Sequence, residues 1–293
     1  MPSEDLEKIA RKIIAEAKRA GATDCDVTIS TRSAVETTVR MGEVEKLEGA
    51  QMSGVEFRAL VGHKSASTST SDLSASAIKQ MVRDTIAMAE ASEADPYSGL
   101  PEIEDLCTTY PELNLYDPSI AEIAVERKIE LAMAAESAAR EADSRITNSD
   151  GASFNDSSGA FIHANSRGFV GGYQGSHVSL SAGVVASKDG EMQTGGWWAT
   201  SRDFKGLESP EKVGKTAAQR ALRQLGARKV KSQEVPVIYD PLMAARLLSQ
   251  FIGAASGAHI YRKSSFMVDK LGEMVANSIV TVIDDPLMPG RLG

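Results

Sequence analysis

The chain has 293 residues, 42% of them hydrophobic and 25% charged, which is typical of a soluble globular protein with a substantial core. Its net charge of −8 argues against direct binding to nucleic acid, because contacts with the phosphate backbone depend on clustered Lys and Arg. The N-terminal stretch lacks the apolar segment of a signal peptide, and no apolar run is long enough to span a membrane. We therefore expect a cytoplasmic protein that contacts neither nucleic acid nor membrane.

The first hundred residues predict one α+β unit. Apolar residues recur at helical spacing from Leu6 to Ala17, and Gly21 ends that run. Alternating apolar residues then predict a strand over 24–32, a second and third strand joined by a tight turn at Met41–Gly42, and a hairpin that turns near Gly62–His63. A second helix is expected to follow, from about Ser74 to Ala91.

The same order of elements returns in the next hundred residues. A long Ala-rich helix is predicted over 118–142, followed by hairpins with turns at Asp150–Gly151 and Ser157–Gly159. Two long strands are expected to meet at Lys188–Asp189–Gly190, a strong hairpin signal, and a helix over about 209–225 closes the unit. Helix, antiparallel strands and helix thus occur twice, which favours an old duplication of one α+β plan.

The third part of the chain predicts the start of a C-terminal α/β segment. A short apolar strand at Val235–Tyr239 precedes a helix capped by Asp240–Pro241, and a second strand is expected at Ile279–Ile283. Since strands need neighbours and this segment supplies few, we expect the sequence to be truncated in its C-terminal domain. The predicted organisation is an N-terminal α+β domain at 1–95, a Pro-rich acidic linker at 96–117, a central α+β domain at 118–228 and the C-terminal segment at 234–293.

No local motif for catalysis or metal binding is present. A zincin helix needs two His and a Glu within one short segment, but none of the four histidines is followed by Glu and no two lie within five residues of each other. The Ser residues near His163 lack the nucleophile elbow, and the Gly-rich stretches lack the pattern of a phosphate-binding loop. We therefore assign no catalytic residue and no metal ligand to this chain.

Five residues are candidates for contacts with a peptide or a partner. Trp197 and Trp198 are neighbours in a predicted strand, so one ring should be buried and the other exposed or at an interface. His259, Arg262 and Lys263 lie in the stretch GAASGAHIYRKSSF, where the two cations could meet a peptide carboxylate. A structural role for His259 and a solvated surface for the two cations remain the alternatives.

Three stretches of the sequence resemble the TldD/PmbA family, whose members were once called modulators of DNA gyrase. VRMGEVEKLEGAQMSGVEFRALVGHKSASTST is similar to the N-terminal domain of that family, and NSDGASFNDSSGAFIHANSRGFVGGYQGSHVSLSAGVVASKDGEMQTGGWW to its central domain. PVIYDPLMAARLLSQFIGAASGAHIYRKSSFMVDKLGEMVANSIVTVIDDP resembles the start of its C-terminal domain. The resemblance covers nearly the whole chain and preserves the order of the segments.

The resemblance implies a role in proteolysis or peptide maturation. In the TldD-like branch a His-Glu motif with a second His makes a metalloprotease, whereas the PmbA, or TldE-like, branch lacks the motif and pairs with the first. In LLSQFIGAASGAHIYRKSSF, glycine, alanine and serine stand where the ligands would be. The implied function is a non-catalytic subunit of a cytoplasmic TldD-type metalloprotease that acts on unfolded or modified peptides, with zinc only in the TldD-like partner.

Several alternatives stay open at this point. The chain could be a metallopeptidase in its own right, with ligands from the rest of the C-terminal domain or from a partner. It could also be a modulator of gyrase that acts through protein contacts. In isolation, it could form a homodimer instead of a heteromer.

Overall fold

The computed structural model describes residues 3–109 and 111–291. The chain divides into two compact units, one formed by Met1–Ala227 with Leu287–Gly293 and the other by Arg228–Pro286. No helix among the described residues has the length and apolar character needed to cross a membrane.

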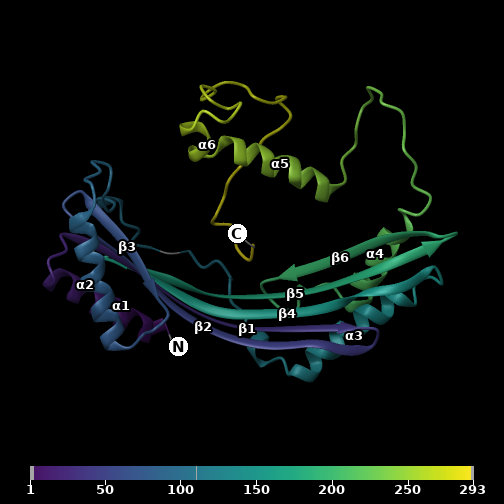
Figure 1. Ribbon diagram of the computed structural model, residues 1–293, viewed down its shortest axis with the longest axis horizontal. Helices are drawn as coiled ribbons and strands as arrows, with labels where there is room; N and C mark the ends of the chain where they lie inside the picture. The colour runs from purple at the N-terminus through teal and green to yellow at the C-terminus, as the bar shows by residue number, and fades with distance from the viewer. Residues whose placement is uncertain (1–2, 110, 292–293) are drawn as a thin grey trace. The chain divides into compact units, whose positions relative to one another are not determined.

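The larger unit is built on one antiparallel sheet of six strands (Figure 1). Across the sheet the order is β3 (Lys64–Thr70), β2 (Glu43–Val61), β1 (Asp24–Arg40), β4 (Ile146–Asn165), β5 (Val170–Lys188) and β6 (Glu191–Ser201). The strands of the two predicted α+β units therefore join in a single sheet, because β1 pairs with β4 from Asp26 opposite Asn165 to Val39 opposite Ala152.

Helices cover one face of this sheet at its two ends (Figure 1). At one end α1 (Ser3–Arg19) and α2 (Ala75–Ala91) pack on a core that contains Val27 and Ile29 of β1. At the other end α3 (Val125–Arg140) and α4 (Pro210–Leu222) pack on a core that contains Val39 of β1 and Phe154 of β4. Because Val27, Ile29 and Val39 are separated by even numbers of residues, they point to the same face. The opposite face carries no α-helix from the described part of this unit, but the 3-10 helix at Ile103–Asp105 lies against it, since Asp105 lines a cavity together with Asp26 and Arg58.

The strands are longer and less interrupted than the sequence predicts. The predicted turns at Asp150–Gly151 and Ser157–Gly159 are wrong, because β4 continues through both positions. Gly151 has a φ of 98° and lies where the pairing of β4 with β5 shifts register, which is the mark of a β-bulge. Gly159 pairs with Arg32 in mid-strand, and a Cβ there would overlap the carbonyl oxygen of Thr31.

The tight turns and helix caps agree with the sequence. The turns at Met41–Gly42, Gly62–His63 and Asp189–Gly190 join β1 to β2, β2 to β3, and β5 to β6. The helix α2 begins after Ser74, whose Oγ accepts a hydrogen bond from the Ala77 N–H at 3.3 Å.

The helix predicted over 118–142 is divided into two elements. A short 3-10 helix, η2 (Pro118–Glu122), precedes α3, and another, η1 (Ile103–Asp105), lies earlier in the connection from α2. The division follows from burial: Ile120 is fully buried in the core under the sheet, and the chain becomes extended at Ile123 and Ala124 before α3 starts.

The unit Arg228–Pro286 contains α5 (Pro241–Ala255) and α6 (Gly257–Tyr261). The Asp240 carboxylate caps α5 by accepting a hydrogen bond from the Leu242 N–H at 3.0 Å, as predicted. The predicted strands Val235–Tyr239 and Ile279–Ile283 are wrong, since both segments are irregular. Within the described part of this unit no second strand offers them backbone partners, and a single strand leaves its N–H and C=O groups unpaired.

Candidate functional site

The face of the sheet that carries no α-helix from the described part of the larger unit has mainly polar side chains and a few aromatic rings. Strand alternation places Arg32 of β1, Ser157 and Phe161 of β4, and Tyr173 and His177 of β5 on this uncovered face. The pairing of Ser157 with His177 across β4 and β5 brings the polar side chains of three strands together.

A cavity of about 380 Å³ lies on this uncovered face, and we call it the basic pocket. It has two glycines, Gly159 and Gly175, on neighbouring strands. The side chains that give it chemical character are those of Arg32, Phe161, Tyr173, His177 and Arg202. No Asp or Glu lines it, although the protein as a whole is acidic.

Hydrogen bonds hold the three basic side chains of the pocket in place. Arg32 donates from Nη2 to the Ser157 hydroxyl at 3.2 Å, and the His177 Nε2 is hydrogen-bonded to the Thr200 hydroxyl. Arg202, in the loop after β6, donates from Nη1 to the backbone oxygen of Ser176 and from Nε to that of Arg291, each at 3.3 Å. Each guanidinium has five N–H donors, so both retain donors for a ligand.

The electrostatics of the pocket are those of an anion-binding site. Burial lowers the pKa of His177, and the nearby positive charges of Arg202 and Arg32 lower it further. The imidazole is therefore neutral at pH 7, while both guanidinium groups are charged. Neither Arg32 nor Arg202 forms an ion pair with any carboxylate in the part of the chain that the structure describes.

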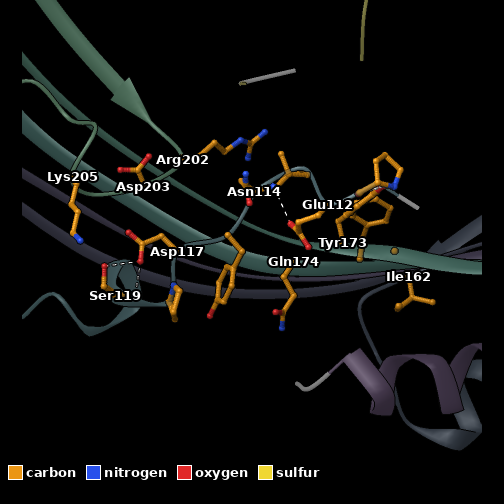
Figure 2. Close-up of a pocket in the computed structure, with 16 residues that line it drawn as sticks. Glu112, Asn114, Asp117, Ser119, Ile162, Tyr173, Gln174, Arg202, Asp203 and Lys205 are labelled. Atoms are coloured by element: carbon orange, nitrogen blue, oxygen red, sulfur yellow. Dashed lines mark hydrogen bonds between the residues drawn. The ribbon is translucent and has the colours of Figure 1, made fainter. Parts of the chain in front are cut away.

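A larger cavity, of about 980 Å³, adjoins the basic pocket and shares Phe161, Tyr173 and Arg202 with it (Figure 2). Its other wall is the connection that leads to η2, in which Asp117 accepts hydrogen bonds from the N–H groups of Phe204 at 3.0 Å and Ser119 at 2.9 Å. These two residues hold the pKa of Asp117 below its usual range. Asp117 thus fixes the wall of the cavity instead of presenting a free carboxylate.

Family models match three successive segments of the chain. They are described as PmbA/TldA metallopeptidase domain 1 at residues 25–89, the central domain at 118–225 and the C-terminal domain at 232–293. The chain belongs to the PmbA/TldD family.

Curated relatives of this PmbA/TldD-family chain carry the name PmbA. The metalloprotease PmbA homolog of Haemophilus influenzae is 34% identical over 289 residues, which cover 99% of this chain and 63% of the relative. Metalloprotease PmbA of Escherichia coli is 34% identical over 93% of this chain and 60% of its own length. The chain therefore spans about three fifths of the length of these relatives.

Solved structures confirm the α+β fold with its curved antiparallel sheet. A putative modulator of DNA gyrase from Bacteroides thetaiotaomicron superposes with a TM-score of 0.90 at 26% identity, over 99% of this chain and 66% of its own. TldE from Thermococcus kodakarensis has a TM-score of 0.79 at 17% identity, over 89% of this chain and 58% of its own, a likeness in fold alone.

The two tryptophans of the PmbA/TldD-family chain point to opposite faces of β6, as the sequence predicts. Trp197 is partly buried on the helix side, where its Nε1 donates to the Glu208 carboxylate at 2.9 Å and the Arg220 guanidinium lies 5.5 Å from the ring centroid. Trp198 is 54% exposed, and alternation places it on the same face as Thr200, the partner of His177. A contact of either ring with a peptide or partner stays a prediction.

The other three predicted residues lie in the unit Arg228–Pro286. His259 is exposed in α6, with its Nδ1 at 3.2 Å from the Ser264 hydroxyl, and Arg262 and Lys263 follow it at the surface. No group of three or more His, Cys, Asp or Glu side chains among residues 3–109 and 111–291 is arranged to hold a metal ion. Peptide or partner contacts of these three residues stay predictions.

The sequence analysis missed the basic pocket. Arg32 lies in a row of alternating polar residues, Thr28 and Ser30, which marks an uncovered strand face. That pattern alone does not reveal which residues surround Arg32, because its neighbours Ser157 and His177 come from strands more than a hundred residues later.

Proposed function

We propose that this chain is a PmbA/TldE-like, non-catalytic subunit of a cytoplasmic TldD-type metalloprotease that acts on unfolded or modified peptides. One observation carries the proposal. The segment that matches the C-terminal domain model contains LLSQFIGAASGAH, in which residues without metal-binding side chains precede His259. Family membership and the PmbA names of the relatives support a role in proteolysis.

The donor set around His259 does not fit a zinc site. Zinc in a metalloprotease is held by three protein side chains, usually His with Glu or Asp, and a fourth position is left for water. The helices α5 and α6 contain no carboxylate and no second imidazole, and the Nδ1 of His259 contacts the Ser264 hydroxyl. In this proposal zinc is held by a TldD-like partner, and the chain described here contributes surface for the peptide.

The uncovered face of the sheet is suited to that contribution. An extended peptide can pair its backbone N–H and C=O groups with a strand edge and place alternate side chains in pockets beside that edge. Arg32, Arg202 and the exposed ring of Trp198 offer charged and apolar contacts for such a peptide.

Co-expression with a TldD-like chain that carries the His-Glu motif tests the proposal. We expect the two chains to co-purify, and peptide hydrolysis to disappear when the Glu of the partner's motif is replaced by Gln. His259→Ala in this chain should leave the zinc content of the pair unchanged. One tightly bound zinc per chain in this protein alone, lost in His259→Ala, would instead make it a metallopeptidase in its own right. A failure to co-purify would exclude the subunit role.

A further inference from the structure

We propose that the basic pocket binds the C-terminal carboxylate of an extended peptide. This assignment rests on the proposed function, because it names the part of the peptide that the uncovered face of the sheet would recognise. It concerns Arg32, Arg202 and His177 with the aromatic pair Phe161 and Tyr173, all of which line the pocket.

The charge of the basic pocket suits a carboxylate. Arg32 and Arg202 both line a cavity with no carboxylate in its wall, and neither has an ion-pair partner among the described residues. By contrast, Arg58 on the same face of the sheet forms an ion pair with Asp26, and Arg167 is paired with Asp24. The carboxylates nearest to the pocket, those of Glu112, Asp117 and Asp203, line the adjoining cavity and are not paired with either arginine. Two unpaired cations in one pocket provide the charge that a carboxylate ligand needs.

The hydrogen-bond donors of the basic pocket also suit a carboxylate. The pocket offers the remaining donors of two guanidinium groups, each fixed in position by bonds to Ser157, Ser176 and Arg291. Guanidinium forks match the two oxygens of a carboxylate, and such charge-assisted bonds are about twice as strong as neutral ones. His177 lines the same pocket, and because its imidazole is neutral, a ligand does not have to displace water from a third charged group.

The size and lining of the basic pocket suit the last residue of a peptide. A volume of about 380 Å³ exceeds that of a small inorganic anion and suits a terminal residue of a peptide. The rings of Phe161 and Tyr173 lie with their centroids 6.2 Å apart, and Phe161 is 43% exposed, so an apolar wall is available for the terminal side chain. The adjoining cavity of about 980 Å³ leaves room for the preceding residues of the peptide.

The same wall also exposes the edge of a strand. The strand β6 pairs with β5 only from Val178 onward, so the earlier part of β5 extends past the end of β6. There the Ser176 N–H donates a hydrogen bond to the Leu115 carbonyl oxygen at 2.9 Å. Because alternate residues of a strand direct their backbone groups to the same side, those of Gly172 and Gln174 face this edge. An extended peptide is the ligand that such an edge accepts.

The test compares two peptides on the purified 293-residue chain without any partner. The probes are fluorescein-labelled pentapeptides of one sequence ending in Leu, one with a free C-terminal carboxylate and one with a C-terminal amide. Fluorescence anisotropy should give a Kd for the acid at least about tenfold lower than for the amide. Arg32→Gln and Arg202→Gln should each weaken binding of the acid and remove most of the difference between the two peptides.

Two further variants separate this pocket from general effects of charge. Arg83→Gln removes one positive charge from the exposed surface of α2 and should leave the acid preference unchanged. Gly175→Val keeps both arginines but fills the pocket, because a Cβ there lies 3.7 Å from Arg202 Nη1, and it should weaken binding of both peptides. Thermal unfolding of each variant checks that the fold is retained.

Several outcomes would overturn the assignment. These are equal binding of acid and amide, no binding of either, or an acid preference that survives both Arg32→Gln and Arg202→Gln. Displacement of the peptide by inorganic phosphate at concentrations near the peptide Kd would reduce the pocket to a general anion site. The peptide test needs no partner, so its outcome is independent of the subunit role. A preference for the acid peptide, with no co-purification of this chain and a TldD-like chain, would refute only the subunit role. Co-purification of the two chains, with no preference for the acid peptide, would refute only the assignment of the pocket.

Discussion

Lys128 of α3 and Asp156 of β4 form a buried ion pair that joins the helix to the sheet. The Lys128 Nζ lies 2.6 Å from Oδ1 of Asp156 and donates a hydrogen bond to Oδ2 at 2.9 Å. Their side chains are only 4% and 6% exposed, respectively. Each charge therefore depends on the other, because water is excluded from both.

Removal of the lysine alone should destabilise the protein strongly. Lys128→Met leaves the Asp156 carboxylate buried without its counter-charge, which costs about 3–5 kcal/mol. The double variant Lys128→Met, Asp156→Leu should recover most of that loss, since it buries no charge at all. Urea unfolding at pH 7 measures both. A single variant as stable as the parent protein would show that the pair contributes little.

Glu136 makes stability depend on pH through the turn between β1 and β2. Its carboxylate accepts hydrogen bonds from the N–H groups of Met41 at 2.7 Å and Gly42 at 2.8 Å. Burial by itself raises the pKa of Glu136, but hydrogen bonds from Ser149, Gly42 and Met41 outweigh burial and hold the pKa below its usual range. The stabilisation is therefore present above the unfolded-state pKa and is lost as the pH falls through the folded-state pKa.

Glu136→Gln tests this dependence directly. At pH 7 the variant should lose about 1–3 kcal/mol, the usual cost of weakening hydrogen bonds to a buried charged acceptor. The difference from the parent protein should shrink as the pH is lowered toward 3, because the parent carboxylate then becomes protonated. Urea midpoints at several pH values measure it, and a difference that is constant with pH would contradict the assigned role.

Gly214 permits the close packing of α4 on α3. A Cβ at this position would overlap the carbonyl oxygen of Ala135 and lie 2.8 Å from the Ala139 nitrogen. Gly214→Ala should therefore destabilise the protein by about 1–3 kcal/mol, despite the better helix propensity of alanine. Gly49→Ala on β2 is the matched control, because nothing lies within 4 Å of its Cβ. Melting temperatures that fall equally in both variants would refute the packing argument.

The two cysteines should differ sharply in reactivity. Burial raises the pKa of the Cys25 thiol to about 11, with a further rise from the Asp26 carboxylate, whereas Cys107 is exposed. Only a thiolate reacts readily with a disulfide reagent. At pH 8 an aromatic disulfide reagent should therefore titrate one thiol quickly, and Cys107→Ser should abolish that phase until the protein is unfolded. Two fast thiols in the parent protein would contradict the burial of Cys25.

Local signals in the sequence predicted the parts of the fold that local chemistry determines. Ser74 caps α2, Asp240 caps α5, and Asp189–Gly190 turns a hairpin, because each depends on residues at most four positions away. The predicted turn at Gly151 is wrong because local residues do not determine it. A glycine with positive φ suits a bulge as well as a turn, and the pairing with the neighbouring strand decides between them.

Long-range pairing determines the rest, including the site. Alternation in β6 was enough to predict that Trp197 and Trp198 face opposite sides. The basic pocket was not predictable, because Arg32 and Arg202 line one pocket only through the registers of β1 with β4, β4 with β5 and β5 with β6. The predicted strands at 235–239 and 279–283 failed because apolar, β-branched residues favour a strand only where a partner strand is available.

The pairing of β1 with β4 has a consequence for biosynthesis. During translation, β1 emerges more than a hundred residues before the strand that pairs with its second edge, from Asp26 to Val39. Until Asn165 has left the ribosome, that edge is open and able to pair with other chains, and contacts so distant in sequence form slowly. The nascent N-terminal half should therefore be the stage at which this protein depends most on chaperones.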